Sequence, residues 1–310
     1  MAELKLERIS GNSYLADLQI SIGVYFNEHN RSAVLIDSGS TEKTAKAIEA
    51  AVQKKGYRIA SIIVTHGHAS QLGGLPYFKS LYADLNIYAS SWTKQFIEKR
   101  ALENWISGHI PCLPNEAADP AQEHFEDCVT DILAYRDHDC TIEDATFSIV
   151  ALPGHFPGSI GVITPDGVFY CGDALFGHKT LSKQKLLYYT DIRGAKQSLE
   201  KIEDSKHTAY ILCHGGKHHH VGSLVQQHLH LIDETSHYLL NLIRSQPMTL
   251  EAIVQKVMQE YQLKSTAGHL TLAHSIVRSY LTDLSHSMKL RASVMDGLVY
   301  YYDYSSPIPV

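Results

Sequence analysis

Four strand-like runs of this chain each end in a histidine or an aspartate followed by small residues. They read "IIVTHGH", "IVALPGH", "VFYCGD" and "YILCHGG", in that order along residues 62–216. In layered α/β folds, functional groups are held where strands stop and loops begin. Imidazole nitrogens together with a carboxylate are donors suited to zinc or to iron. A single histidine at a strand end is usually structural and would be weak evidence for a metal site. Four such segments in succession together predict a metal site at a sheet edge of an α/β protein.

The segments before and between these runs complete the α/β pattern. Residues 13–27 and 32–40 have the β-branched and aromatic composition of strands. A helix is expected from Thr41 to Lys55, because its apolar residues fall on one face and Gly56 follows as a stop signal. Residues 91–140 are polar and are expected to be mostly helical, as an excursion from the core that covers a site.

The C-terminal part has a different character. From about residue 222, apolar residues recur three and four positions apart, which predicts helices. The last two strands flank Asp296 and Gly297, a hairpin signal. Helices followed by such a hairpin predict a small winged-helix-like domain. Because Pro247 and a helix cap mark a boundary near residue 245, the expected domains are 1–245, the α/β domain, and 246–310.

Bulk properties exclude several classes of protein. The formal charge is −6 and the isoelectric point is about 6.3, which argues against binding nucleic acid by bulk electrostatics. The first residues, "MAELKLERIS", lack the apolar core of a secretion signal. No apolar run approaches the roughly 20 residues of a membrane helix. The five cysteines show no CxxC pairing, so reduced thiols and a cytoplasmic location are expected, with no membrane partner.

The charge of residues 246–310 bears on the role of the tail, because winged helices often bind DNA. The segment has five basic and five acidic residues: Lys256, Lys264, Arg278, Lys289 and Arg291 against Glu251, Glu260, Asp283, Asp296 and Asp303. No basic stripe follows the second helix, so a nucleic-acid partner is not expected. The tail is expected to form a homodimer contact or a wall of the active site.

The motifs resemble the signature of the metallo-β-lactamase superfamily of metallohydrolases. That signature runs His-x-His-x-Asp-His, then Pro-Gly-His-x-x-Gly-Ser, then Gly-Asp, then a late His-Gly, and this chain has "HGHASQ", "PGHFPGS", "CGDALF" and "CHGG". "LIDSGS" matches an early Asp-Ser/Thr-Gly turn, in which Asp37 is expected to hold loops by hydrogen bonds. The resemblance covers residues 5–220. It implies a four-layer αβ/βα sandwich with metals at one edge between two sheets, and a subset of these hydrolases has a similar tail.

Carried onto this sequence residue by residue, the resemblance implies a ligand set. The first metal site would comprise His66, His68 and His155. Asp173 would be the bridging carboxylate, and His214 would be a ligand of the second metal.

The chain departs from the signature at Ser70 and Gln71, where two further second-site ligands are expected. Two divalent ions about 4 Å apart repel by roughly 16 kcal/mol at an effective dielectric of 20. Serine in place of aspartate removes a negative charge that would offset this repulsion, and glutamine in place of histidine supplies only a weak amide oxygen. We therefore predict one tightly bound metal, zinc with iron as the alternative, and a second site that is weak or empty.

One ion held by three histidines keeps a position for water, whose pKa zinc lowers to about 7. The resemblance thus implies a hydrolase that cleaves a small ester, thioester, lactone or phosphoester by attack of metal-bound hydroxide. Asp173 would ligate the metal or orient the water, and His214 would donate to the oxyanion or leaving group. One alternative is a catalytically silent or regulatory member that binds a ligand in the same cleft. Another is a mononuclear iron dioxygenase, since His66, His155 and Asp173 form a two-histidine-one-carboxylate set.

Overall fold

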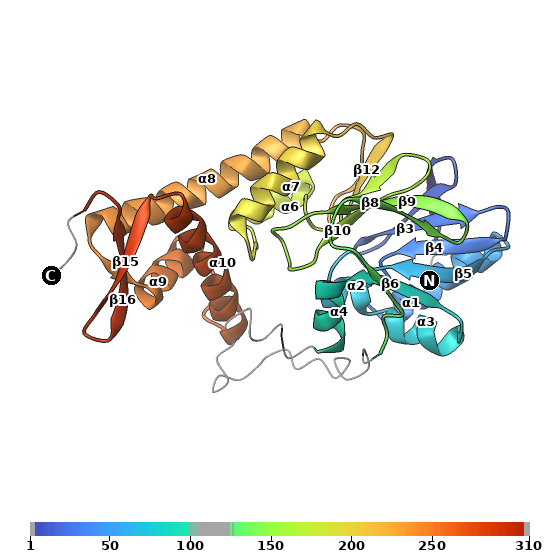
Figure 1. Ribbon diagram of the computed structural model, residues 1–310, viewed down its shortest axis with the longest axis horizontal. Helices are drawn as coiled ribbons and strands as arrows, with labels where there is room; N and C mark the ends of the chain where they lie inside the picture. The colour runs from blue at the N-terminus through green and yellow to red at the C-terminus, as the bar shows by residue number, and fades with distance from the viewer. Residues whose placement is uncertain (1–3, 100–101, 103–124, 126, 307–310) are drawn as a thin grey trace.

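The computed structural model describes residues 4–99, 102, 125 and 127–306. Two large β-sheets lie face to face in the N-terminal part (Figure 1). The first sheet has seven strands in chain order: β1 Leu6–Ser10, β2 Ser13–Asp17, β3 Ser21–Asn27, β4 Ser32–Ile36, β5 Arg58–Ile63, β6 Asn86–Ser90 and β7 Asp131–Leu133. The second sheet has six, in the order β13-β12-β11-β10-β9-β8: β8 His138–Ile142, β9 Ala145–Ala151, β10 Ile160–Ile163, β11 Val168–Tyr170, β12 Ala209–Leu212 and β13 Gly216–His218.

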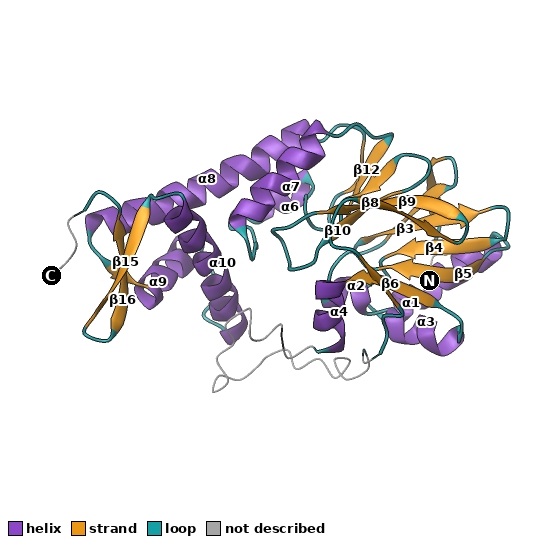
Figure 2. Ribbon diagram, viewed as in Figure 1, coloured by secondary structure: helices purple, strands orange, loops and turns teal. Residues whose placement is uncertain are grey.

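Helices cover the outer faces of both sheets (Figure 2). On the first sheet these are α1 Glu42–Lys54, α2 Ala69–Leu72, α3 Leu75–Leu81 and α4 Ser91–Glu98. On the second sheet they are α6 His178–Lys183, α7 Ile192–Asp204 and α8 Gly222–Ser245. The apolar side chains between the sheets form a core of their own, in which Ile36 and Ile63 of the first sheet join Phe147 and Ile211 of the second. The four-layer α/β sandwich expected from the sequence is therefore present.

The helix expected at Thr41–Lys55 is confirmed, and its signals act as expected. Thr41 is the N-cap, since its side-chain oxygen accepts a hydrogen bond from the backbone N–H of Thr44. Gly56 follows the last turn with a φ of +79°, a conformation that suits glycine. Residues on the expected apolar face, Ala45 and Ile48 among them, are buried against the first sheet.

The mostly helical interpretation of residues 91–140 is correct for α4 and wrong for the end of the segment. Residues 103–124 lie outside the described residues. Asp131–Leu133 and His138–Ile142 are strands, and each lies at an edge of its sheet. Two of the three residues of β7 are exposed, and β8 alternates between half-buried and exposed residues along most of its length. Such edge strands carry little apolar signal, which is why the sequence pattern missed them.

The tail consists of helices and a small sheet beyond the end of α8. Its elements are β14 Met248–Thr249, α9 Leu250–Glu260, α10 Ala267–His286, β15 Leu290–Met295 and β16 Leu298–Asp303, with strand order β14-β16-β15. The expected hairpin is confirmed, and Asp296 and Gly297 both have the positive φ of a tight hairpin turn. The boundary at residue 245 and the winged-helix classification remain predictions.

One hydrophobic cluster joins the tail to the outer face of the second sheet. It runs from Phe169 in β11 through Leu199 of α7 and Ile232 of α8 to Tyr280 of α10. Lys196 of α7 adds an ion pair with Asp283 of α10, over 3.5 Å. These contacts hold α10 beside the α/β sandwich. In the part of the chain that is described, no helix has the length and apolar character needed to cross a membrane.

Candidate metal centre

His66 is held by a chain of hydrogen bonds that begins at Asp37, just beyond β4. The carboxylate of Asp37 accepts from the backbone N–H of Thr65 (2.8 Å) and from the Thr65 hydroxyl (2.8 Å). The Thr65 Oγ1 lies 3.1 Å from Nδ1 of His66. Because threonine has one O–H and gives it to Asp37, its oxygen accepts from Nδ1–H of His66. The lone pair of His66 Nε2 is therefore left free to bind a metal.

Asp37 holds this loop as expected from the sequence. Its φ is +66°, a left-handed conformation that aspartate tolerates better than most residues. Burial raises the pKa of Asp37 to about 6, while the charge of His66 and the hydrogen bonds from Thr65 oppose that rise. At neutral pH the group is an anion that can accept both hydrogen bonds from Thr65.

His155 is oriented from the opposite side. It lies in the loop between β9 and β10, and its Nδ1 is 3.2 Å from the carbonyl oxygen of Tyr188. A carbonyl only accepts, so Nδ1 carries the proton and Nε2 presents a lone pair. Burial lowers the pKa of His155 to about 4, outweighing the opposing charge of Asp173, so the ring is neutral at physiological pH. Neutral imidazole is the form that binds a metal.

His68 and Asp173 complete the group. His68 is the N-cap residue of α2, and its Nδ1 lies 3.2 Å from Nε2 of His155. Asp173 follows β11, and its Oδ2 lies 3.5 Å from Nε2 of His66 and 3.6 Å from Nε2 of His155. Burial alone would raise the pKa of Asp173, but electrostatic attraction to the surrounding His66, His155 and His214 outweighs it and holds the pKa below its ordinary value.

The geometry fits a metal ion. One ligand atom from each of His66, His68, His155 and Asp173 lies within 4.8 Å of the other three. Nε2 of His66 and Oδ1 of Asp173 are buried and have no hydrogen-bond partner among the described residues. Buried polar atoms without partners are costly, so two of them in one cluster need a ligand. Three imidazole nitrogens and a carboxylate are suited to zinc or iron, and the partners of His66 and His155 fix the ring tautomers.

His214 lies beside this group but outside the set of four. It follows β12, and its Nε2 is 3.6 Å from Oδ2 of Asp173. Its side chain is 35% exposed, against 4% for the Asp173 side chain. The structure thus brings together all five residues expected from the sequence, with four as a compact donor set and His214 at the rim. Their roles as ligands or catalysts remain proposals.

Ser70 and Gln71 bind each other and a cysteine. The Ser70 hydroxyl donates to Oε1 of Gln71 over 2.6 Å, and Nε2 of Gln71 donates to Sγ of Cys213 over 3.1 Å. Gln71 is fully buried in α2. Both ends of its amide are therefore satisfied by the protein itself.

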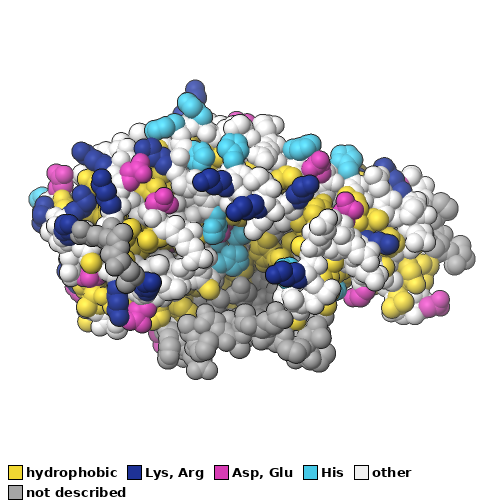
Figure 3. Space-filling model, turned by 180° about the vertical axis from the view of Figure 1, so that it is seen from behind, with side chains coloured by type: hydrophobic (Ala, Val, Ile, Leu, Met, Phe, Trp, Pro, Cys, Tyr) yellow, Lys and Arg dark blue, Asp and Glu magenta, His cyan; other side chains and the backbone are white. Residues whose placement is uncertain are grey.

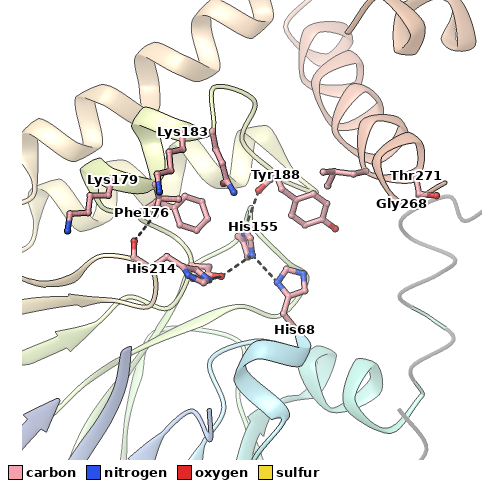
Figure 4. A pocket seen from close by; sticks show the side chains of 13 residues that line it. His68, His155, Phe176, Lys179, Lys183, Tyr188, His214, Gly268 and Thr271 are labelled. Atoms are coloured by element: carbon pink, nitrogen blue, oxygen red, sulfur yellow. Dashed lines mark hydrogen bonds and ion pairs between the residues drawn. The ribbon is translucent and has the colours of Figure 1, made fainter. Parts of the chain in front are cut away.

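The centre opens into a cavity of about 610 Å³ (Figure 4). The donors His68, His155 and Asp173 line this cavity together with His214. The other lining residues come from the segment after Asp173 and from α10: Phe176, Lys179, Thr180, Lys183, Gln184, Tyr188, Gly268, Thr271 and Leu272. In the space-filling view, histidine side chains lie in a hollow bordered by basic side chains (Figure 3). The tail thus forms part of a cavity wall, one of the two roles expected for it.

Several residues of the site were not expected from the sequence. Thr65, which orients His66, differs from an ordinary strand residue only by directly preceding the first histidine. Lys179 and Lys183 stand four residues apart shortly after "CGDALF", and that spacing is a readable signal for one helix face. Thr271 carries no local signal, because it reaches the cavity only through the packing of the tail.

A search against family models matches residues 16–214 to the model described as the metallo-beta-lactamase superfamily. The chain belongs to the metallo-beta-lactamase superfamily. This assignment confirms the resemblance and the fold class expected from the motifs. It also supports a metal cofactor at the histidine and aspartate cluster.

The curated relatives that this chain matches are distant. A hydroxyacylglutathione hydrolase of Photobacterium profundum is 24% identical over 50% of this chain and 46% of its own length. The "Probable metallo-hydrolase YflN" of Bacillus subtilis is 25% identical over 59% of this chain and 75% of its own length. An uncharacterized protein of Aquifex aeolicus is 26% identical over 51% of this chain and 67% of its own. The match thus spans less than half of the hydroxyacylglutathione hydrolase.

Two solved structures share the fold along nearly the whole chain. A metallo-beta-lactamase family protein from Thermus thermophilus has a TM-score of 0.69 and 16% identity, over 94% of this chain and 98% of its own. A beta-lactamase domain protein from Burkholderia ambifaria has a TM-score of 0.73 and 15% identity, over 97% of this chain and 94% of its own. Since 97% of the chain is matched, the likeness extends beyond the α/β sandwich into the tail.

Proposed function

We propose that this protein is a metal-dependent hydrolase that cleaves a small ester, thioester, lactone or phosphoester and holds one divalent ion tightly at His66, His68, His155 and Asp173. The observation that supports this most directly is the convergence of four donor atoms within 4.8 Å at the base of a cavity. The family points the same way, because relatives in it are named as hydrolases. Hydroxyacylglutathione is a thioester, so thioesters are the first substrates to test.

A divalent ion bound here supplies Lewis acidity and a water of lowered pKa. The residues of the chain orient and protect that chemistry. Asp173, whose low pKa makes it a weak proton acceptor, is better suited to binding and orienting than to general-base work. His214, half-buried at the cavity, is placed to give a proton to the departing group. The Phe176 ring packs against the rings of His155 and His214 and keeps water from that side of the cluster.

The test is metal analysis combined with a substrate panel. Protein purified without added metal should contain close to one equivalent of zinc or iron and hydrolyse at least one ester or thioester. Chelation should abolish that activity, and adding back the metal should restore it. His155→Ala should remove both metal and activity, while His230→Ala, an exposed histidine of α8, should keep both. Protein without metal or hydrolysis would favour the silent alternative, and bound ferrous iron with oxygen uptake would favour the dioxygenase.

A further inference from the structure

Two lysines of α6 line the cavity above the metal centre. Lys179 and Lys183 are four positions apart in this short helix, so their side chains leave it on the same face. Both border the same cavity as His155 and His214. In Figure 4 they lie on one side of the cluster, together with Phe176.

Within the described part of the chain, neither lysine has an acidic partner. Among the residues that the structure describes, Lys179 and Lys183 form no ion pair, whereas Lys196 and Lys201 do. Among the described residues that line the cavity, Asp173 is the one carboxylate, and it is buried and faces the histidines. A cavity wall with two unpaired positive charges concentrates anions from solution.

The opposite wall comes from the tail, and the described residues that the tail contributes to it are uncharged. Gly268, Thr271 and Leu272 belong to the first turns of α10, a helix of 20 residues. Gly268 and Thr271 are seen in Figure 4 across the cavity from the lysines. The positive end of the α10 dipole adds to the field of the lysines rather than cancelling it. The cavity of about 610 Å³ between these walls has the size of an ordinary small-molecule site.

We propose that Lys179 and Lys183 form an anion subsite that binds a carboxylate or phosphate group on the substrate and so selects an anionic ester or thioester. This inference rests on the proposed hydrolase function and deepens it by naming the substrate class. The anionic group lies away from the bond that is cleaved. Its contacts with the lysines are therefore equally strong in the ground state and in the transition state. Binding of this kind changes KM more than kcat.

Matched substrates and variants test the subsite. S-acetyl-3-mercaptopropionate carries a carboxylate, and S-acetyl-3-mercaptopropionamide is its neutral isostere. The kcat/KM of the parent protein should favour the anion by about tenfold or more, the scale of a charged hydrogen bond. Lys179→Met with Lys183→Met should reduce the preference to near one, through a higher KM for the anionic substrate. Lys185→Met is the matched control, because Lys185 is exposed in the same segment and does not line the cavity.

A binding measurement separates failure of the subsite from failure of the proposed hydrolase. Inorganic phosphate is titrated into metal-free protein by calorimetry, so that no hydrolysis is required. The parent and the Lys185→Met variant should bind phosphate, and the double variant should bind it at least about tenfold more weakly. Added salt should weaken binding to the parent. Lysine-dependent phosphate binding without thioester hydrolysis would uphold the subsite and reject the hydrolase.

Three results would overturn the anion subsite. One is equal phosphate affinity in the parent and the double variant. Another is hydrolysis of both thioesters at the same kcat/KM by the parent. The third is lysine-dependent cleavage of a single-stranded RNA oligonucleotide without cleavage of either thioester, which would assign the charges to a polymer backbone and reject a small-molecule site.

Discussion

The side-chain amide of Gln71 donates a hydrogen bond to Sγ of Cys213, 3.1 Å away in the protein interior. Ser70 donates to the other end of the same amide, over 2.6 Å. The two residues that depart from the superfamily signature are therefore joined by hydrogen bonds to each other and to Cys213. Because Cys213 directly precedes His214, the network also ties α2 to the end of β12. A second ion would have to break these hydrogen bonds and would gain only a hydroxyl and an amide oxygen.

Restoring the signature should restore a second metal. The double change Ser70→Asp with Gln71→His adds a carboxylate and an imidazole where the chain now has neutral oxygen donors. Metal analysis of the purified variant should show an increase from one ion per chain toward two. Gln71 is fully buried, so a histidine at this position must fit into a closely packed space. Circular dichroism should therefore accompany the metal analysis, to check that the variant is folded.

The matched control is Ser70→Asn with Gln71→His, which has the same shape and lacks the negative charge. Its second-site occupancy should lie well below that of the aspartate variant, because the charge offsets repulsion between the ions. Two ions in the parent protein, or equal occupancy in both double variants, would contradict the charge argument.

Thr65 should matter for metal affinity although it does not touch the metal. Thr65→Val removes the hydroxyl that links Asp37 to Nδ1 of His66 and changes the shape little. The His66 ring would lose its fixed tautomer, so the metal dissociation constant should rise by about 10–100-fold. Competition with a chromogenic chelator measures the change. Thr164→Val, a buried threonine bonded to Ser13 away from the cluster, should leave metal affinity unchanged.

The metal centre could largely be predicted from the sequence because its residues follow strands. Strand order and parallel pairing carry the ends of β5 and β11 to one edge of the sandwich, so His66 and Asp173 meet although 107 positions separate them. What could not be predicted depends on packing of distant segments. The pairing of Gln71 with Cys213 requires the two sheets to be in register, and no local pattern encodes it. The contribution of Thr271 to the cavity depends on how the tail rests on α7 and α8.

The fold could be predicted least well where strands lie at sheet edges. β9 and β12 are clear in sequence, because their apolar residues are buried on one or both faces. β7 and β8 are short and exposed, so a polar segment expected to be helical contains strands. The tail helices could be predicted because, unlike β7 and β8, they bury apolar residues. α9 and α10 bury residues such as Val254, Val257 and Ile276 at helical spacing.

His228 should make stability depend on pH. It is buried in α8, where Nδ1 donates to the carbonyl of Leu224 and Nε2 accepts from the backbone N–H of Phe176. Burial lowers its pKa to about 4. Between pH 6.5 and 4 the unfolded chain binds a proton that the folded protein does not, so the free energy of unfolding falls as the pH falls. This one group should account for about 3 kcal/mol over that range.

The variant His228→Gln tests whether the pH dependence of stability comes from His228. The amide oxygen of glutamine can still accept from the backbone N–H of Phe176, and the amide does not titrate. Urea unfolding of metal-free parent and variant should be compared at several pH values from about 7.5 to about 4, a range that spans the ordinary and the lowered pKa of the imidazole. The stability of the parent relative to the variant should decrease as the pH is lowered and level off near pH 4. Parallel stability curves for the two proteins would show that His228 does not contribute.

Gly158 in "PGHFPGS" should be essential for stability and for metal binding, because of crowding around it as well as its backbone conformation. Its φ is +81°, and a Cβ there would lie 2.6 Å from Cβ of Trp92 and 2.8 Å from the backbone nitrogen of Thr93. Its carbonyl also accepts from the hydroxyls of Ser90 and Thr93. Gly158→Ala must therefore displace either the start of α4 or the loop that carries His155. We expect a lower free energy of unfolding and weaker metal binding.

Gly297 provides the matched control, because its φ is +79° and nothing lies within 4 Å of the position of its Cβ. Alanine at either site bears the same backbone cost, about 1 kcal/mol for a left-handed residue. The crowding at Gly158 should add about 1–3 kcal/mol to that cost. Urea unfolding of Gly158→Ala and Gly297→Ala measures the difference, and metal titration should show a weaker site only in Gly158→Ala. Equal destabilisation by the two changes would mean that the loop carrying His155 shifts to accommodate the methyl group. Gly158 would then be needed only for its positive φ.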